Sequence, residues 1–240
     1  DTGNAVKKAA EDVRGQLIAT AADAFGCDSA EVVYEGDRIF VGGNPEAALS
    51  FADVAAISFY AGDGPPLGRG SWLAKGPYDH LPGRGFGEHP AAVYMFGTHV
   101  AEVEVDPETG RTEVVDYTAC HDVGQVINQQ GIEGQVEGGV VQGIGYGLYE
   151  RLALRDGRIQ NPSFVDYQIP TALDAPPIKT LFVEEPDPTG PFGAKGIGEP
   201  PFIPPMPAIA NAIYDALGVR VKDVPITPEK LWRAVHKQES

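Results

Sequence analysis

Residues 128–150 read NQQGIEGQVEGGVVQGIGYGLYE, and this stretch decides how the rest of the chain is expected to fold. Apolar residues recur in it at every fourth position, which predicts a helix with one buried face: Ile132, Val136, Val140, Ile144 and Leu148. Glycines lie between them, at Gly134, Gly138, Gly139, Gly143, Gly145 and Gly147. Each glycine costs a helix about 0.8–1 kcal/mol relative to alanine, so some close contact must offset the loss.

A second row of residues runs along the same helix at every fourth position, and it carries almost no side chains. The row consists of Gln135, Gly139, Gly143 and Gly147. A face without side chains lets another helix, a strand or a flat ligand approach the backbone closely, and the Gln135 amide offers both donors and an acceptor. From this row alone, close packing of protein beside a surface glutamine and contact with a ligand are equally good interpretations.

The second informative stretch is GPFGAKGIGEPP, residues 190–201. Its glycines let the backbone approach a ligand and present N–H groups to it. Glu199 precedes Pro200, and a residue before proline is pushed out of the helical region, so we expect Glu199 to be extended at the end of the loop. A restricted carboxylate at the end of a flexible loop suits acid–base chemistry. A solvated turn with Glu199 facing water is the alternative, and on this segment alone it is the more frequent case.

The balance of charges excludes several classes of partner. Lys and Arg number 18 against 34 Asp and Glu, which gives a formal net charge of -16 at pH 7. Nucleic-acid phosphates and anionic membranes would be repelled, and no apolar run is long enough to span a bilayer. Cys27 and Cys120 lack metal-ligand spacing and are too few for a disulfide framework. We therefore expect reduced thiols and a cytoplasmic location.

His121 and Asp122 are neighbours in an expected strand and invite comparison with a catalytic pair. Neighbouring side chains of a strand point to opposite faces, so a structural role is the favoured interpretation. The remaining histidines, at positions 80, 89, 99 and 236, show no ligand spacing. We assign no metal to protein side chains.

The pattern of the whole chain predicts a mixed α+β fold, taken as one region over residues 1–240. We expect helices over residues 2–25, 45–57, 128–150, 204–217 and 228–236. We expect strands over residues 31–34, 38–41, 93–105, 112–119 and 180–184, with a short hairpin at 152–159. Residues 60–90 form a long loop, which Trp72, Tyr78 and Phe86 are expected to anchor by burial. Because the chain opens on a helical pattern, we expect Asp1 to be a cut within a longer polypeptide or the edge of a split subunit.

Three segments in this order and spacing go beyond composition: VGQVIN at residues 123–128, GQVEGGVVQGIG at 134–145 and GAKGIGEPP at 193–201. Together they resemble the molybdenum-binding subunit of the xanthine dehydrogenase/aldehyde oxidoreductase family, the molybdenum hydroxylases. The resemblance covers essentially the whole chain but only the C-terminal part of that subunit, whose N-terminal part is absent here. It implies a mixed α/β fold around a molybdopterin cofactor, whose metal is held by the pterin dithiolene and small ligands and not by protein side chains.

The resemblance also assigns roles to individual residues. The family's glutamate base falls on Glu199, which would take the proton from a molybdenum-bound hydroxyl whose oxygen then attacks an electron-poor carbon of a small organic substrate. Gln135 would hydrogen-bond the edge of the pterin. Further cofactor contacts fall on the glycine face of the helix and on the backbone of the loop: Gly139, Lys195, Gly196, Ile197 and Gly198.

The implied activity is that of an oxidative hydroxylase or dehydrogenase, present as a fragment or split subunit. The cofactor would be molybdopterin or its cytosine dinucleotide form, with molybdenum. The implied partners are the remainder of the molybdopterin subunit, a [2Fe–2S] subunit, an FAD subunit and a small organic substrate, which in relatives is a purine, an N-heterocycle, an aldehyde or carbon monoxide. A non-catalytic scaffold or assembly chain of the same fold is the alternative, and the intact loop and Gln135 row favour the enzyme. A phosphate-binding loop is disfavoured because the spacing GxxxxGK[ST] does not occur.

Overall fold

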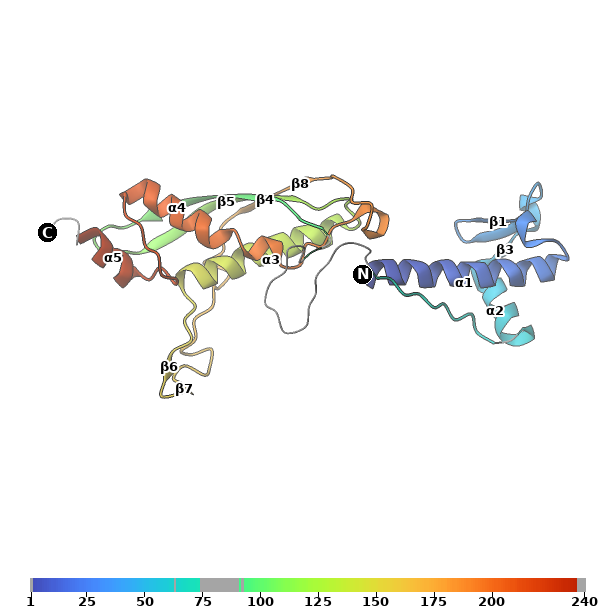
Figure 1. The fold of residues 1–240 in the computed structure, drawn as a ribbon, viewed down its shortest axis with the longest axis horizontal. Coiled ribbons are helices and arrows are strands. Elements are labelled where there is room, and N and C mark those ends of the chain that lie inside the picture. Colours follow the sequence, from blue (N-terminus) through green and yellow to red (C-terminus); the bar gives the residue numbers. More distant parts are fainter. Residues whose placement is uncertain (1, 63, 74–90, 92, 237–240) are drawn as a thin grey trace. The chain divides into compact units, whose positions relative to one another are not determined.

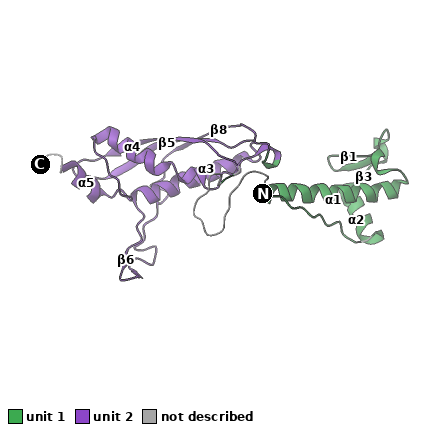
Figure 2. Cartoon of the chain, viewed as in Figure 1, with its two compact units in different colours: residues 1–92, 189–191 green, residues 93–188, 192–240 purple. Residues whose placement is uncertain are grey.

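The computed structural model describes residues 2–62, 64–73, 91 and 93–236 of the chain. Two units divide the chain: unit 1 holds residues 1–92 and 189–191, and unit 2 holds residues 93–188 and 192–240 (Figure 2). Each unit combines helices with strands, as the sequence predicts for a mixed α/β chain (Figure 1). Among the described residues, no helix is sufficiently long and apolar to cross a membrane.

Unit 1 is built around the long helix α1 (Thr2–Phe25), which packs on α2 and on the strands β1 and β2. The strands form a small antiparallel sheet in the order β1-β2-β3. The buried core of the unit consists of Leu17, Ala21, Ile39 and Val54. The other elements are η1 (Ser29–Glu31), β1 (Val32–Glu35), β2 (Arg38–Val41), η2 (Pro45–Ala47), β3 (Leu49–Ser50) and α2 (Phe51–Ala61).

The helix predicted over residues 45–57 is wrong at its start, because α2 begins at Phe51. Ser50 and Asp53 form a capping box at this point. The Ser50 hydroxyl accepts the Asp53 backbone N–H at 3.1 Å, and the Asp53 carboxylate accepts the Ser50 N–H at 3.0 Å. This reciprocal pair satisfies two N–H groups that an uncapped helix would leave unbonded, so it fixes the first turn.

The long loop after α2 is described only in part. Trp72 is half-buried, and the Lys8 ammonium of α1 lies 5.0 Å from its ring centre. This contact agrees with an anchoring role for Trp72. Tyr78 and Phe86 lie outside the described residues.

The sheet of unit 2 contains β4 (Gly97–Val105), β5 (Thr112–Asp122) and β8 (Ile178–Val183), in the order β4-β5-β8. β4 and β5 form the predicted antiparallel hairpin, although β4 begins later than residue 93 and β5 continues past Ala119. β5 and β8 run parallel, so the chain must cross over between them, and it does so through the helix α3 (Gln129–Leu148). The helix α4 (Pro205–Leu217) packs against α3 and β4, and α5 (Pro228–His236) follows (Figure 1).

The apolar ladder of α3 faces the core of unit 2, as the sequence predicts. Val136, Val140 and Ile144 are fully buried, and they share one cluster with Tyr117 and Ala119 of β5. The helix is therefore held mainly by burial of this face and not by its glycine-rich sequence.

The glycines of α3 fall into two groups. A Cβ on Gly139 would lie 2.7 Å from Cβ of Pro201, and a Cβ on Gly143 would lie 2.6 Å from Cβ of Pro205, so protein closes both positions. A Cβ on Gly138 would meet no atom within 4 Å. For Gly139 and Gly143 the structure thus favours close packing of protein, one of the two interpretations of the glycine row.

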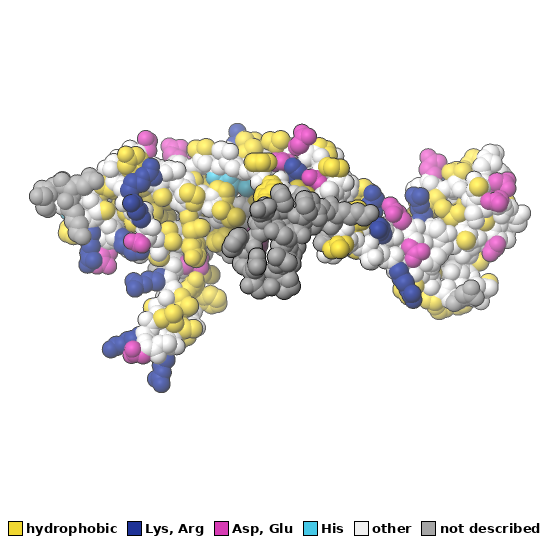
Figure 3. Space-filling view, viewed as in Figure 1, with side chains coloured by type: hydrophobic (Ala, Val, Ile, Leu, Met, Phe, Trp, Pro, Cys, Tyr) yellow, Lys and Arg dark blue, Asp and Glu magenta, His cyan; other side chains and the backbone are white. Residues whose placement is uncertain are grey.

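Between α3 and β8 the chain forms an arm, residues 150–173, which carries the short strands β6 (Leu154–Arg155) and β7 (Arg158–Ile159) (Figure 1). Several large apolar side chains of the arm are exposed, among them Phe164 at 82%, Val165 at 86% and Leu173 at 96%. Figure 3 shows apolar side chains along the arm and basic side chains near its end.

Candidate functional site

The candidate site lies where the two parallel strands of unit 2 end. The last residues of β5 and β8 are paired, Asp122 with Val183, so the chain leaves both strands at the same edge of the sheet. After β5 the chain enters α3, where the Asn128 side chain caps the helix by accepting the Gly131 N–H at 2.9 Å. In α/β proteins, ligands bind outside the carboxyl ends of parallel strands and beside the helix that follows.

A cavity of about 230 Å³ opens at this edge. It brings together three of the residues singled out from sequence, Gln135 of α3 with Lys195 and Ile197 of the glycine-rich loop. The other residues that line it come from the β5–α3 connection, the start of α3 and the loop: Val123, Gln125, Ile127, Asn128, Gly131, Ile132 and Ala194. The three sequence segments that carry the family resemblance therefore meet in unit 2.

The glycine-rich loop is joined to the β5–α3 connection by backbone hydrogen bonds. The Lys195 N–H donates to the Val123 carbonyl at 2.9 Å, and the Gln125 N–H donates to the Gly193 carbonyl at 3.0 Å. Gly124 sits between these two bonds with a φ of 64°, and a Cβ there would clash with the Gly193 carbonyl. Both the positive φ and the close approach of the two segments require glycine at this position.

Side chains reinforce this junction. The Lys195 ammonium lies 2.5 Å from the Asp122 carboxylate, and the two side chains are 8% and 11% exposed. The other oxygen of Asp122 accepts the Gly124 N–H at 3.1 Å. Burial raises the pKa of the Asp122 carboxyl, but the hydrogen bonds from Lys195 and Gly124 outweigh burial, so its pKa lies below the usual value.

The middle of the loop is open. A Cβ on Gly196 would meet no atom within 4 Å, and a Cβ on Gly198 would meet only the Gln135 side-chain oxygen, at 4.0 Å. Gly198 and Gln135 are thus neighbours, and both are exposed. Among the described residues, none hydrogen-bonds to the backbone of Gly196, Ile197 or Gly198. Their N–H and carbonyl groups are free to meet a ligand.

Gly139, for which a cofactor contact was expected, does not belong to this open surface. It is buried, and Pro201 and the backbone of Phe202 occupy the side on which a Cβ would lie. The physical reason is that residues 200–202 form the short helix η4 (Pro200–Phe202), which packs directly on α3. The absence of a side chain at Gly139 admits protein and not a flat ligand.

Glu199 is not extended, contrary to the expectation from Pro200. Its backbone adopts φ -110° and ψ -27° at the N-cap of η4, directly before the first residue of that helix, and its carbonyl accepts the Phe202 N–H at 3.0 Å. The hydrogen bond and the packing of Pro201 on α3 outweigh the preference that the following proline imposes. The Glu199 side chain is exposed and follows Gly198 directly, although it does not line the cavity itself.

His121 and Asp122 do not pair with each other, which confirms the structural interpretation. Asp122 binds Lys195, whereas the His121 ring is 1% exposed and its Nε2 lies 2.7 Å from Nε2 of His99. His99 Nδ1 in turn lies 2.9 Å from the Tyr117 hydroxyl. The alternation of side chains along β5 sends the two neighbours to opposite faces.

Protein ligands for a metal are not found in the described part of the chain, where no three His, Cys, Asp or Glu side chains are arranged to hold an ion. His80 and His89 lie outside that part.

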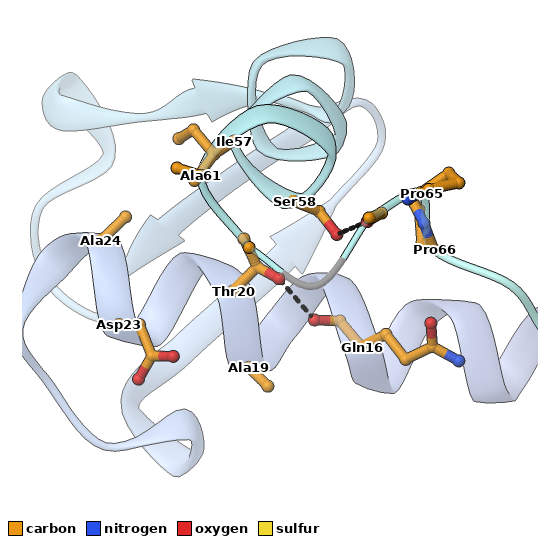
Figure 4. A pocket seen from close by; sticks show the side chains of 12 residues that line it. Gln16, Ala19, Thr20, Asp23, Ala24, Ile57, Ser58, Ala61, Pro65 and Pro66 are labelled. Atoms are coloured by element: carbon orange, nitrogen blue, oxygen red, sulfur yellow. Dashed lines mark hydrogen bonds between the residues drawn. The ribbon is translucent and has the colours of Figure 1, made fainter.

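A wider hollow of about 570 Å³ lies in unit 1, between α1, α2 and residues 64–66 (Figure 4). Three of the four polar side chains that line it, those of Gln16, Thr20 and Ser58, are bonded within the unit. The Ser58 hydroxyl donates to the Gly64 carbonyl at 2.9 Å, the Thr20 hydroxyl donates to the Gln16 carbonyl at 3.1 Å, and the Gln16 amide bonds both backbone groups of Leu67. Volume alone does not make this hollow a candidate site, because most of its polar side chains are already bonded to the unit itself.

Comparison with known proteins shows the family to which the chain belongs. The family model of the molybdopterin cofactor-binding domain matches residues 2–176. This chain belongs to that family. The molybdopterin-binding chain is 36% identical over 239 residues to the large subunit of nicotine 6-hydroxylase from Paenarthrobacter nicotinovorans, which covers 97% of this chain and 28% of the relative. It is 40% identical over 178 residues to the aldehyde oxidoreductase of Megalodesulfovibrio gigas. This match covers 73% of this chain and 19% of the relative.

Solved structures agree with this assignment and confirm the mixed α/β fold. The Cu,Mo-CO dehydrogenase superposes with a TM-score of 0.77 at 25% identity, over 99% of this chain and 29% of that one. The aldehyde oxidoreductase from Desulfovibrio desulfuricans ATCC 27774 superposes with a TM-score of 0.71 at 31% identity, over 98% of this chain and 22% of that one. Of these relatives, the CO dehydrogenase is described as a Cu,Mo enzyme. The molybdopterin-binding chain spans less than a third of the length of each of them.

No role at the site was assigned to Asp122 from the sequence, because Asp122 was considered only together with His121. The available signal was its position at the end of a strand, directly before the VGQVIN segment. Gln125 and Asn128 lie in that segment and line the cavity, but no role was assigned to them.

Proposed function

We propose that this chain forms one wall of a molybdopterin site in a molybdenum hydroxylase and supplies its glutamate base. The observation that carries the proposal is the junction at the end of β5 and β8, where Gln135 adjoins Gly198 and the open loop leads directly to Glu199. A side-chain amide and free backbone groups are the donors and acceptors that the polar edge of a pterin needs.

The size of the cavity argues for a shared site. Pockets that enclose a small organic ligand measure about 300–1,000 Å³, whereas this one measures about 230 Å³. These residues thus fit one edge of molybdopterin, or of its cytosine dinucleotide form, and the rest of the molybdopterin subunit would supply the remainder. Gln135 would hold the pterin edge, and the backbone of Lys195, Gly196, Ile197 and Gly198 would line it.

When bound, the cofactor would supply the oxidation chemistry. The residues of this chain would position it and move a proton. Glu199 is exposed and lies beside the loop, so its carboxylate would accept the proton of the hydroxyl whose oxygen is transferred to an electron-poor carbon of the substrate. Because Glu199 caps η4 and directly precedes it, the packing of Pro201 on Gly139 would fix the position of this base.

The proposed partners rest on the family resemblance and on relatives that are named as subunits of larger enzymes, and the proposed location rests on the expectation of reduced thiols. A [2Fe–2S] subunit and an FAD subunit would carry the electrons away, in the cytoplasm. The named relatives act on nicotine, on aldehydes or on carbon monoxide. We propose a small molecule of these classes as substrate, to be identified by assaying the whole enzyme with nicotine, benzaldehyde, xanthine and carbon monoxide and a dye as electron acceptor.

The test of cofactor binding is the variant Gln135→Ala in the whole molybdopterin subunit with its partner chains. Loss of one hydrogen bond of about 0.5–1.5 kcal/mol should weaken cofactor binding by up to about tenfold, seen as a lower molybdenum and pterin content per subunit after dialysis. Gln142→Ala is the matched control, because Gln142 is exposed on the same helix but outside the cavity. Equal molybdenum content in both variants would show that Gln135 does not bind the cofactor.

A further inference from the structure

Asp122 and Lys195 form a buried ion pair between two segments that lie far apart in the sequence. Their side chains are 11% and 8% exposed, and the charged atoms are 2.5 Å apart. The pair between Arg233 and Glu229 in α5 has a similar separation of 2.6 Å, but its side chains are 62% and 71% exposed. Of these two ion pairs, only Asp122–Lys195 is largely buried.

Burying two charges needs a compensating benefit. The desolvation of such a pair costs about as much as the mutual attraction returns, so a buried ion pair seldom adds much net stability. It does fix geometry, because both charges must stay together. Asp122 is suited to this, since one carboxylate oxygen holds Lys195 and the other accepts the Gly124 N–H. The lowered pKa of Asp122 agrees with a carboxylate that remains charged in this position.

The pair stands at one end of the open part of the loop. On its N-terminal side the loop is bound to the β5–α3 connection, through the Lys195 N–H and the Val123 carbonyl at 2.9 Å. On its C-terminal side, Pro201 packs on Gly139 of α3. Residues 196–199 span the gap between the two anchors. The position of this span depends on both ends being held.

We propose that the Asp122–Lys195 pair is a latch that holds the glycine-rich loop against the β5–α3 connection and so positions residues 196–199 at the cavity. Asp122 and Lys195 are positioning residues in this inference, which rests on the proposed function. The Lys195 ammonium is occupied by Asp122, so Lys195 meets a cofactor through its backbone and not through its charge.

The test is amide hydrogen exchange of the whole enzyme, measured after removal of the cofactor so that its contacts do not contribute. The double variant Asp122→Asn with Lys195→Met removes both charges together, which avoids an unpaired buried charge. We expect the amides of residues 193–199 to exchange at least about tenfold faster, while those of β5 and α3 keep their protection. Lys195→Arg, which keeps the charge, should restore most of the protection in the loop.

The matched control is the double variant Glu229→Gln with Arg233→Gln, which removes the exposed pair of similar length and should leave the loop unchanged. Wild-type exchange of residues 193–199 in the Asp122/Lys195 double variant would overturn the latch, and so would equal loss of protection throughout unit 2, which would show a general effect on stability. These outcomes do not depend on cofactor content, so they can be distinguished from a failure of the proposed function, which the molybdenum content of Gln135→Ala tests.

Discussion

At the scale of single residues, the half-buried His99 and the buried His121 contribute to the response of unit 2 to acid. The two rings lie 2.7 Å apart at their Nε2 atoms, so one of these atoms must carry the proton and the other must accept it. Burial lowers the pKa of His99 to about 4, assisted by the proximity of His121, and burial also lowers the pKa of His121. Both rings are therefore neutral at pH 7, and a second proton would charge a desolvated pair.

The lowered pKa values of this pair predict that the free energy of unfolding decreases in acid. The unfolded chain binds a proton on His99 near pH 6.5, whereas the folded chain does so only near pH 4, so the unfolded state holds more protons between these values. The free energy of unfolding should fall as the pH falls from about 6.5 towards 4. His99→Gln should reduce this fall, and urea unfolding of both proteins at several pH values measures it. Identical pH dependence in the two proteins would contradict the assignment.

At the scale of elements, α3 combines an apolar face that anchors it in the core with a glycine row that lowers its helix propensity. The ladder through Val136, Val140 and Ile144 anchors it in the core. Its glycine row gives up helix propensity so that η4 and the start of α4 can pack on its backbone. Glu199 is the N-cap of η4, so the backbone contact at Gly139 connects the packing of a helix to the position of the proposed base.

Substitutions at two neighbouring glycines of α3 test whether η4 packs on Gly139. Gly139→Ala places a methyl group 2.7 Å from Cβ of Pro201, so it should destabilise the chain by about 1–3 kcal/mol through overpacking. Gly138→Ala meets no atom within 4 Å, so it should stabilise the helix by about 0.5–1 kcal/mol. Urea unfolding of the two variants measures both effects. Changes of the same sign would show that η4 does not pack on Gly139 as described.

Much of this arrangement could be predicted from sequence, because it depends on local patterns. The period of α3, the β4–β5 hairpin and the bounds of α1 and α5 follow from hydrophobic spacing and turn residues. The backbone conformation of Glu199 and the surroundings of Gly139 could not be predicted from sequence, because both depend on a contact between residues about sixty positions apart in the chain. The Asp122–Lys195 pair is equally non-local, because its members lie 73 positions apart in the sequence.

At the scale of the whole molecule, the arm over residues 150–173 stands out by its exposed apolar side chains (Figure 3). A two-stranded hairpin is marginally stable by itself, and exposed apolar patches mark surfaces that bind protein. The chain spans less than a third of its relatives, so the proposed remainder of the molybdopterin subunit is large enough to cover this surface.

The arm therefore predicts a difference between the isolated chain and the whole enzyme. Phe164, Val165 and Leu173 are exposed in this chain. If the remainder of the subunit covers them, the amides of residues 161–173 should exchange much more slowly in the whole enzyme. Hydrogen exchange followed by mass spectrometry on both preparations measures this, with the buried strand β5 as a reference that should change little. Equal exchange of residues 161–173 in both preparations would show that the arm stays exposed after assembly.

The proposed role of Glu199 is tested most directly by Glu199→Gln in the whole enzyme, with molybdenum content and turnover measured on the same sample. Glu137→Gln is the control, because Glu137 is exposed on α3 outside the cavity. If Glu199 is the base, Glu199→Gln keeps normal molybdenum content, while turnover of the panel substrate that the wild type oxidises fastest falls by about 10²–10⁴-fold. Turnover close to that of the wild type at normal molybdenum content would contradict the account.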